Sequence, residues 1–140
     1  MVGLGCGARS YTRALHYSSE YAVGAGGVRA ILSDYVRRPA ETFAYAHHGF
    51  ALDGEEQRRR YLIQSLLQAD GLVYAAYRAR FGAEPLDDMP ALTELAERGL
   101  STLTEGRMQL TEAGLENSDT IGPWLYSARV GELMQSYEPV

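Results

Sequence analysis

The first eleven residues hold the densest set of residue types that could contact a small molecule. They read MVGLGCGARSY, so glycine recurs at every second position before a short polar segment. Small residues let a cofactor approach backbone amides, and an arginine guanidinium can pair with a carboxylate. The candidate cofactor- and substrate-proximal segment therefore consists of Gly3, Gly5, Gly7, Ala8, Arg9 and Ser10.

The same segment is open to a purely structural interpretation. A dinucleotide-binding fingerprint needs its third glycine later and an amphipathic helix after it, and the sequence offers neither. Alternating glycines also serve where another backbone passes close to a strand end. Arg9, and likewise Arg13, fits a solvated or ion-paired side chain as well as a ligand contact.

Cysteine and histidine usage limits the metal chemistry of this chain. Cys6 is the only cysteine, which excludes an intramolecular disulfide and any iron–sulfur site built by this chain alone. His47 and His48 are adjacent, and neighbouring residues on a strand point to opposite faces, so they cannot converge on one ion. His16 is interpreted as a packed or surface histidine rather than a base. We predict no metal site and assign no catalytic residue.

Tyrosine is abundant, with ten residues spread over both halves of the chain. At helical spacing such side chains usually pack at the edge of a core and keep the hydroxyl in water. A flat ligand could also stack on some of them. Those considered are Tyr11, Tyr17, Tyr21, Tyr35, Tyr45, Tyr61, Tyr74 and Tyr77.

Length and composition indicate an ordinary globular chain. Its 140 residues, 46% hydrophobic and 22% charged, suffice for one domain, or one domain with part of another. No apolar run approaches the roughly 20 residues that span a bilayer, and no signal-peptide pattern opens the chain, so we expect a cytoplasmic protein. The net charge is -5, but residues 1–50 carry five arginines against three acids, whereas residues 51–140 carry eight against fifteen.

The stretch from Leu92 to Asp119 sets the expected architecture. Its apolar spacing changes from about 3.6 to 2 and back, which predicts a helix, a hairpin turning at Glu105 and Gly106, and another helix. Gly99 has the position of a helix-ending glycine, and Thr111 that of a helix cap. This order is typical of the second half of a winged-helix module.

Flanking patterns supply the remaining elements. Helices are predicted at 28–38 before Pro39, at 54–68, around Val73 to Phe81, at 115–121 up to a break at Gly122-Pro123, and from about Ser127 onward. Strand-like alternation covers 10–18 and 42–50. The fold class is therefore α+β and mainly helical, with domains at 1–50 and 51–140 divided near the turn at 49–54.

An ordered set of motifs resembles one known family. GLGCGARSY, a helix ending at a proline, the acidic helix start Asp53-Gly-Glu-Glu56, Leu95-x-x-x-Gly99-Leu100 and Leu110-Thr111-x-x-Gly114 follow one another along the chain. In this order they resemble the C-terminal part of radical S-adenosylmethionine (SAM) proteins. Within that superfamily the chain is similar to oxygen-independent coproporphyrinogen III oxidases and their haem-chaperone-like relatives, over essentially all 140 residues.

The resemblance implies a specific place in a larger enzyme of haem biosynthesis. It implies a partial (β/α) barrel that holds a [4Fe-4S] cluster on a Cys-x-x-x-Cys-x-x-Cys loop, and a winged-helix-like C-terminal domain that covers a porphyrinogen or haem. Residues 1–50 would be the end of that barrel, a strand plus a helix, with Gly3 to Ser10 near SAM and substrate. Because the cysteine loop is missing from this chain, we predict a fragment that is not catalytic alone and whose partner is the N-terminal barrel.

Residues before Gly49 are expected to be poorly anchored by themselves. The opening strand around Gly3 to Gly5 has no evident partner strand in this chain to satisfy its backbone groups. The other hypothesis is a free-standing winged-helix module that binds DNA or a protein. Its recognition helix, about Asp88 to Arg98, carries Asp88, Glu94 and Glu97 against Arg98, so it would repel phosphate and favours a protein partner.

Overall fold

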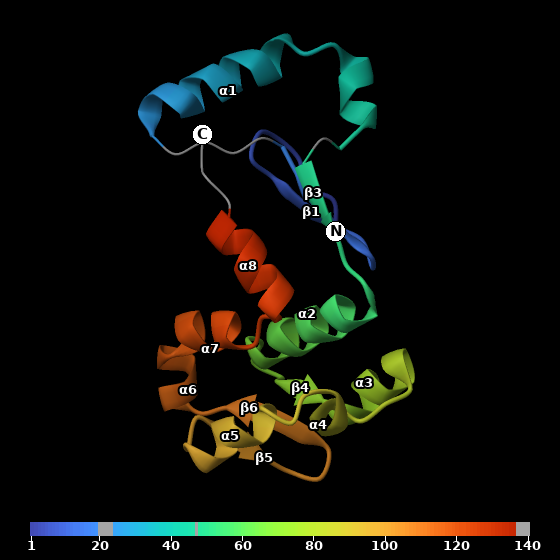
Figure 1. Cartoon of the computed structure of the whole chain (residues 1–140), viewed down its shortest axis with the longest axis vertical. Coiled ribbons are helices and arrows are strands. Elements are labelled where there is room, and N and C mark those ends of the chain that lie inside the picture. The colour runs from blue at the N-terminus through green and yellow to red at the C-terminus, as the bar shows by residue number, and fades with distance from the viewer. Residues whose placement is uncertain (20–23, 47, 137–140) are drawn as a thin grey trace. The chain divides into compact units, whose positions relative to one another are not determined.

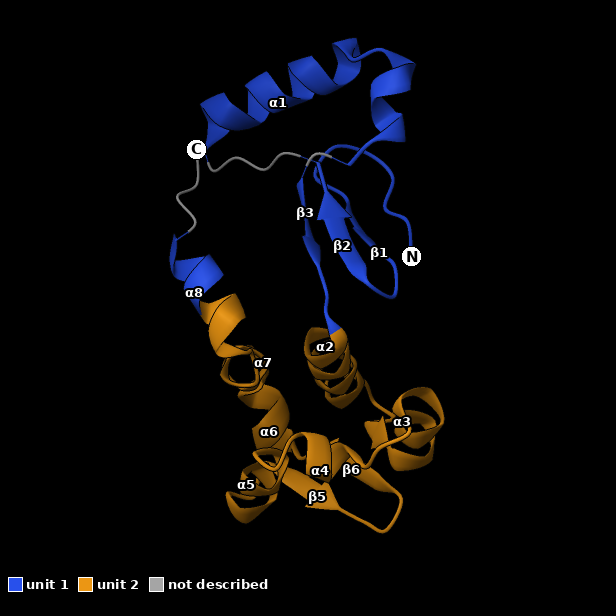
Figure 2. Cartoon of the chain, turned by 45° about the vertical axis from the view of Figure 1, so that its right-hand side comes forward, with its two compact units in different colours: residues 1–53, 132–140 blue, residues 54–131 orange. Residues whose placement is uncertain are grey.

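The computed structural model describes residues 1–19, 24–46 and 48–136, and its fold class is α+β, as predicted. Helices dominate, and two small antiparallel sheets complete the secondary structure of this part of the chain (Figure 1). The chain divides into two compact units (Figure 2). Unit 1 comprises Met1–Asp53 with Glu132–Val140, and unit 2 comprises Gly54–Gly131.

Unit 1 contains a three-stranded antiparallel sheet in the order β1-β2-β3. A tight loop joins β1 to β2, and Thr12 closes it, because its N–H donates to the Leu15 carbonyl while its hydroxyl accepts the Leu15 N–H at 3.0 Å. The unit's elements up to Asp53 are β1 (Arg9–Tyr11), β2 (Leu15–Ser18), α1 (Ala25–Arg37), the 3-10 helix η1 (Ala40–Ala44) and β3 (His48–Ala51).

The expectation of an unpaired opening strand is wrong. Residues 1–8 form no strand, and the strand that follows them, β1, pairs in full with β2. Met1 also exchanges backbone hydrogen bonds with Tyr11, since the Tyr11 N–H donates to the Met1 carbonyl at 2.8 Å and the terminal amine donates to the Tyr11 carbonyl at 3.0 Å. The alternation over 10–18 was interrupted by the loop at Thr12, so one predicted strand became a hairpin that satisfies its own backbone.

The predicted helix before Pro39 is confirmed as α1, but the predicted strand over 42–50 is only partly correct. Pro39 restricts its own φ to -60°, and its carbonyl accepts both the N–H and the hydroxyl of Thr42, at 3.1 and 2.8 Å. These bonds start the 3-10 helix η1 instead of a strand. Its Phe43 ring packs edge-on against Tyr35 of α1, with ring centroids 5.1 Å apart, and only the last part of the segment, β3, is extended.

Unit 1 lacks an apolar core in the part that the structure describes. Ser10 is the one buried residue among 1–19, 24–46 and 48–53, and α1 buries none of its thirteen residues. Of the apolar side chains of α1, Ile31 and Tyr35 are half-buried, whereas Val28, Leu32 and Val36 are exposed, Val36 at 81%. Hydrogen bonds, rather than apolar burial, therefore hold this unit together.

Unit 2 contains the second sheet, whose strand order is β4-β6-β5. In the sequence, helices precede, separate and follow its strands. The structure confirms three predicted elements of this unit: the helix at 54–68, the helix that begins at Leu92, and the hairpin that follows it. The unit's elements are α2 (Gly54–Leu66), β4 (Leu72–Val73), α3 (Tyr74–Phe81), α4 (Pro85–Asp88), α5 (Leu92–Glu97), β5 (Ser101–Leu103), β6 (Arg107–Leu110), α6 (Glu112–Glu116), α7 (Ser118–Trp124) and the first residues of α8 (Ala128–Ser136).

Two predicted helix boundaries are confirmed at the level of hydrogen bonds. After α5, Gly99 takes φ 71°, its N–H donates to Ala96, and the Leu100 N–H donates back to the Leu95 carbonyl at 2.8 Å. This pair of bonds is the Schellman motif that ends a helix. The Thr111 hydroxyl accepts the Gly114 N–H at 3.1 Å and so caps α6.

Two further boundaries differ from the prediction. The chain reaches α3 through the short strand β4. Just before β4, the backbone at Gly71 (φ +68°) lies so close to the Met108 carbonyl that position 71 has no room for a side chain. The break or kink expected at Gly122-Pro123 lies slightly later, since α7 ends at Trp124, one residue after Pro123. Pro123 lacks the N–H that would donate to the Asp119 carbonyl, and α7 ends one residue after it; a separate break at Asn117 divides α6 from α7.

The apolar core of the described residues lies entirely in unit 2. Tyr77, Leu62, Leu92 and Met108 are each 0% exposed, and the Tyr77 hydroxyl donates to Asp88 at 2.7 Å. The pKa of Tyr77 is raised, mainly because the hydroxyl is buried and to a smaller extent because it donates this hydrogen bond. The remaining members of the core are Leu66, Leu72, Tyr74, Met89, Leu95, Ile121 and Leu125. Across the described ranges, the helices are all too short or too polar to cross a membrane.

Candidate functional site

The glycine-rich segment forms a compact loop that turns back onto β1. The Gly3 N–H donates to the hydroxyl of the buried Ser10 at 3.0 Å, and a side chain at position 3 would lie only 2.6 Å from the Arg9 carbonyl oxygen. Gly5 and Gly7 have φ values of 101° and 74°, which favour glycine. A Cβ at either of these two positions would meet nothing within 4 Å. Gly3 therefore serves packing, whereas Gly5 and Gly7 leave their backbone open on one side.

The polar residues after the glycines lie on the first strand of the sheet. Arg9 is exposed and Ser10 is buried, because successive residues of β1 point to opposite faces. Tyr11 then stacks on His16 of β2, with ring centroids 4.4 Å apart and ring planes inclined by 19°. Arg13 is exposed in the loop between these strands. The structure thus brings Arg9 and an aromatic pair onto one hairpin.

The remaining candidates are dispersed. Cys6 is a half-buried free thiol, Ala8 is half-buried between the loop and β1, and His48 is exposed on β3, while His47 and Tyr21 lie outside the described residues. Of the tyrosines, Tyr74 and Tyr77 are buried in unit 2, where they contribute to the core. Within the described part of the chain, no three His, Cys, Asp or Glu side chains lie close enough together to hold a metal ion.

The donor set does not fit an iron–sulfur cluster. Such a cluster needs three thiolates from the protein, and the sequence provides only Cys6. No step of cluster chemistry can therefore be assigned to residues of this chain.

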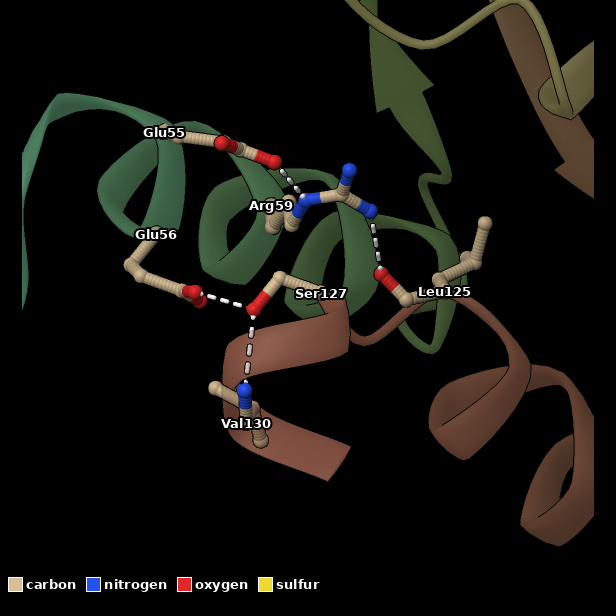
Figure 3. Close-up of polar contacts among 6 residues, drawn as sticks. All are labelled: Glu55, Glu56, Arg59, Leu125, Ser127 and Val130. Atoms are coloured by element: carbon tan, nitrogen blue, oxygen red, sulfur yellow. Dashed lines mark hydrogen bonds and ion pairs between the residues drawn. The ribbon is translucent and has the colours of Figure 1, made fainter. Parts of the chain in front are cut away.

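The structure adds one polar cluster that sequence reasoning missed, at the junction of α2 with α8 (Figure 3). Glu56 of α2 is only 6% exposed, and its carboxylate accepts a short hydrogen bond from the Ser127 hydroxyl. The same hydroxyl accepts the Val130 N–H at 3.1 Å and so caps α8. Beside it, Arg59 donates to Glu55 at 2.7 Å and to the Leu125 carbonyl at 3.0 Å. Together these bonds attach the start of α8 to α2.

The Glu56 position had a local signal, because Asp53 to Glu56 has capping-box spacing. That signal predicts a role at the start of α2, but it contains nothing about a partner 71 residues away. Ser127 was expected only near the start of the last helix. The pairing of the two residues requires the tertiary structure.

Replacing Ser127 by alanine is expected to lower the free energy of unfolding of unit 2 by about 2–3 kcal/mol. The variant removes a helix cap, worth about 1 kcal/mol, and one hydrogen bond to a buried charged group, worth about 1.5–3 kcal/mol, and such terms are not fully additive. Urea denaturation followed by circular dichroism measures the change. Ser136→Ala, which removes only an exposed bond to the Leu133 carbonyl, is the matched control and should change stability by less than about 0.5 kcal/mol. Equal effects of the two variants would contradict a structural role for Ser127.

Comparison with known proteins identifies one segment. Residues 52–116 match the family model described as HemN_C, the HemN C-terminal domain. No curated protein and no solved structure matches the chain. The matched segment begins just before α2 and ends with α6, so it contains the whole second sheet and most of the apolar core. Over residues 52–116, the resemblance to the C-terminal part of HemN-like radical SAM proteins is therefore confirmed.

Proposed function

We propose that this chain is the C-terminal, substrate-covering part of a radical SAM enzyme similar to oxygen-independent coproporphyrinogen III oxidase, and that it is not catalytic alone. The family match over residues 52–116 supports the type of enzyme. The presence of a single cysteine supports the need for a second region that carries the cluster. The second region would be the N-terminal barrel with its three-cysteine loop.

The observation that carries this proposal is the uncovered apolar surface of unit 1. A helix of thirteen residues is marginal in water without tertiary packing, yet α1 buries none of its side chains. Exposed apolar residues recur along one side of it, with Val28 at 43%, Leu32 at 46% and Val36 at 81%. Soluble proteins rarely leave such a stripe in water, which indicates an interaction surface. In this proposal, the N-terminal barrel is the partner that covers this surface.

The glycine-rich loop supplies the contact with cofactor or substrate in this proposal. Gly5 and Gly7 leave room beside their backbone, so a ligand could approach the amides there. Arg9 is exposed next to the loop and can pair with a carboxylate, as carried by SAM or by a porphyrinogen propionate. Ser10 would act indirectly, because its hydroxyl holds Gly3 in place.

A co-expression experiment tests the proposal. The chain would be produced with the barrel region of an oxygen-independent coproporphyrinogen III oxidase that lacks its own C-terminal part. We expect a one-to-one complex that cleaves SAM, whereas iron and sulfide reconstitution of the chain alone should give no [4Fe-4S] absorption. Val36→Asp should abolish the complex, because it places a charge in the apolar stripe. Leu115→Asp, at a 53% exposed position of unit 2, is the control. A complex that is insensitive to Val36→Asp would contradict the role of α1.

We also propose that unit 2 is a winged-helix-like module that works by protein contact. Its α2, α3, α5 and the β5-β6 hairpin have the order of such a module. Against DNA binding, Arg98 at the end of α5 already pairs with Glu94 at 2.5 Å, and the helix also carries Glu97. We therefore expect no shift of duplex DNA by the chain, even at low salt, where phosphate contacts are strongest. Salt-dependent DNA binding in a mobility-shift titration would favour a regulator instead.

A further inference from the structure

Helix α1 carries a basic row beside its exposed apolar stripe, which consists of Val28, Leu32 and Val36. The residues that directly follow the three stripe residues form this row, and all of them are exposed: Arg29, Ser33 and Arg37. Positions four apart lie one above the other on a helix, and neighbouring positions are turned by about 100° around its axis. The two arginines therefore lie on the same side of the stripe, about 12 Å apart along the helix.

The rest of α1 is already in contact with other parts of the chain. Ile31 and Tyr35 are half-buried, and the Tyr35 ring packs edge-on against Phe43 of η1. Elsewhere on the helix, the Arg38 guanidinium donates to the Asp34 carboxylate at 2.6 Å. The stripe and the basic row are thus the part of α1 that is left for a partner.

The charges of the basic row have no partner within the described residues. There, neither Arg29 nor Arg37 forms an ion pair, not even with Glu41 four residues after Arg37. Arg37 has a local explanation, because a cation in the last turn of a helix is favoured by the helix dipole. Arg29 lies in the second turn, where the dipole gives no such benefit. Helix stability therefore does not explain why this side of the stripe is basic.

A surface that covers the stripe must also receive these two charges, because Arg29 and Arg37 directly follow Val28 and Val36 around the helix. Charges at the edge of an interface select a partner of opposite sign, since like charges brought together are unfavourable. A second copy of α1 would place arginines against arginines. Complementary charge therefore favours an acidic partner.

We infer that the surface that binds α1 presents an apolar strip with carboxylates beside it, placed to pair with Arg29 and Arg37. A guanidinium binds a carboxylate through two parallel N–H donors, which fixes the orientation of the contact as well as its charge. This inference rests on the proposed function for the identity of the partner, the N-terminal barrel. It adds the charge of the barrel surface that contacts α1.

Binding to the 140-residue chain is measured by fluorescence anisotropy with two labelled amphipathic peptides, each about three heptads long. Both peptides have leucine at the a and d positions, and they carry either glutamate or glutamine at e and g. They are kept dilute enough to remain monomeric. At low salt we expect the glutamate peptide to bind about fivefold tighter, and high salt should reduce this difference by screening the charges. Amide exchange in α1 should slow, because a ligand of the folded helix stabilises it.

Arg29→Gln and Arg37→Gln should each weaken binding of the glutamate peptide about threefold, the size expected for the loss of one exposed ion pair. Glutamine and arginine have similar helix propensities, so α1 itself is preserved. Arg13→Gln removes the same charge from the exposed loop of unit 1 and is the matched control, which should leave binding nearly unchanged. The double variant Arg29→Lys with Arg37→Lys keeps the charge and should keep the preference for glutamate.

The inference is overturned if the two peptides bind equally, if neither binds at its solubility limit, or if Arg13→Gln weakens binding as much as Arg29→Gln. Two further measurements test other occupants of this face. Flotation with phosphatidylglycerol vesicles detects binding to an anionic lipid surface, and sedimentation velocity detects self-association of the chain. A positive result in either that is lost in Arg29→Gln would assign the face to lipid or to a second copy, and would also overturn the inference.

Failure of this inference is distinguishable from failure of the proposed function. A complex with the barrel that is lost in Val36→Asp, but is unaffected by salt and by Arg29→Gln with Arg37→Gln, would support the proposed function and contradict an acidic contact surface. Arginine-dependent binding of the glutamate peptide without any complex with the barrel would support the acidic partner and contradict the proposed function.

Discussion

In the isolated chain, amides of α1 and β1 are expected to exchange with deuterium about a thousandfold faster than those of α2 and β6. Exchange of protected amides follows the free energy of the opening that exposes them, and a factor of a thousand corresponds to about 4 kcal/mol. The buried apolar side chains of the described residues all lie between Leu62 and Leu125, so the opening of unit 2 exposes a core. The opening of unit 1 exposes hardly any buried apolar surface.

Hydrogen–deuterium exchange with mass spectrometry at neutral pH measures this contrast within a single sample. The internal control is β5, which is short like β1 and lies at a sheet edge, but belongs to the unit with the core. Protection of β1 equal to that of β5 would contradict our view that unit 1 needs a partner. Adding the barrel partner should slow exchange in α1 and leave α2 nearly unchanged.

Gly114→Ala is expected to destabilise unit 2 by about 3 kcal/mol, at the upper end of what overpacking usually costs. A Cβ at this position would fall on the Leu100 carbonyl oxygen, well inside van der Waals contact, and would also approach the Leu110 Cβ at 3.2 Å. That carbonyl accepts the Thr111 N–H at 3.0 Å, a bond that joins the start of β5 to the cap of α6. The alanine must therefore open this junction, and a melting temperature lower by about 15 °C is expected for a unit of this size.

Gly122→Ala is the matched control, since Gly122 is also a buried helical glycine of unit 2. Here a Cβ would meet nothing within 4 Å outside its own helix, so the higher helix propensity of alanine should raise stability by up to about 1 kcal/mol. Scanning calorimetry of the two variants gives shifts of opposite sign if the contact at Gly114 is as close as the structure has it. Shifts of the same sign and size would show that the glycine in the Leu-Thr-x-x-Gly motif has no packing role.

Local signals predicted those parts of the fold whose causes are local. The apolar stripe before Pro39 predicted α1, Gly99 predicted the end of α5, and Thr111 predicted the cap of α6. Each of these depends on residues no more than eleven positions apart. The two-residue strand β4 was missed because its existence depends on pairing with Met108 and Arg107, which are more than thirty residues away.

Errors arose where two local signals competed. Alternation over 42–50 favoured a strand, but hydrogen bonds from Thr42 to the Pro39 carbonyl favoured a 3-10 turn, and the turn prevails at its start. Pro123 was expected to end or kink a single helix from Leu115, but Asn117 already divides this segment into α6 and α7, and α7 ends at Trp124. The opening segment was judged an unpaired strand because glycine at every second position suggests a strand end, but residues 1–8 form a loop in which Gly5 and Gly7 take positive φ values.

The candidate site was predictable only in part. The residue types of the segment from Gly3 to Ser10 marked it as a candidate site, and in the structure this segment is one loop followed by the first strand. The stacking of Tyr11 on His16 depends on the hairpin register, which the alternation pattern did not fix. The bond between Glu56 and Ser127 joins residues that are distant in sequence, and its position follows from how α8 packs on α2.

The sheet of unit 1 pairs its backbone hydrogen-bonding groups but buries almost no apolar surface. This property affects how much intact protein a cell can maintain. The folded population of this unit is governed by mass action, because whatever covers α1 contributes the missing burial free energy. Copies made in excess of their partner would remain substrates for proteases between the glycine-rich loop and Asp53, while the HemN_C segment survives as a resistant core. The abundance of the partner would thereby set the abundance of the intact chain.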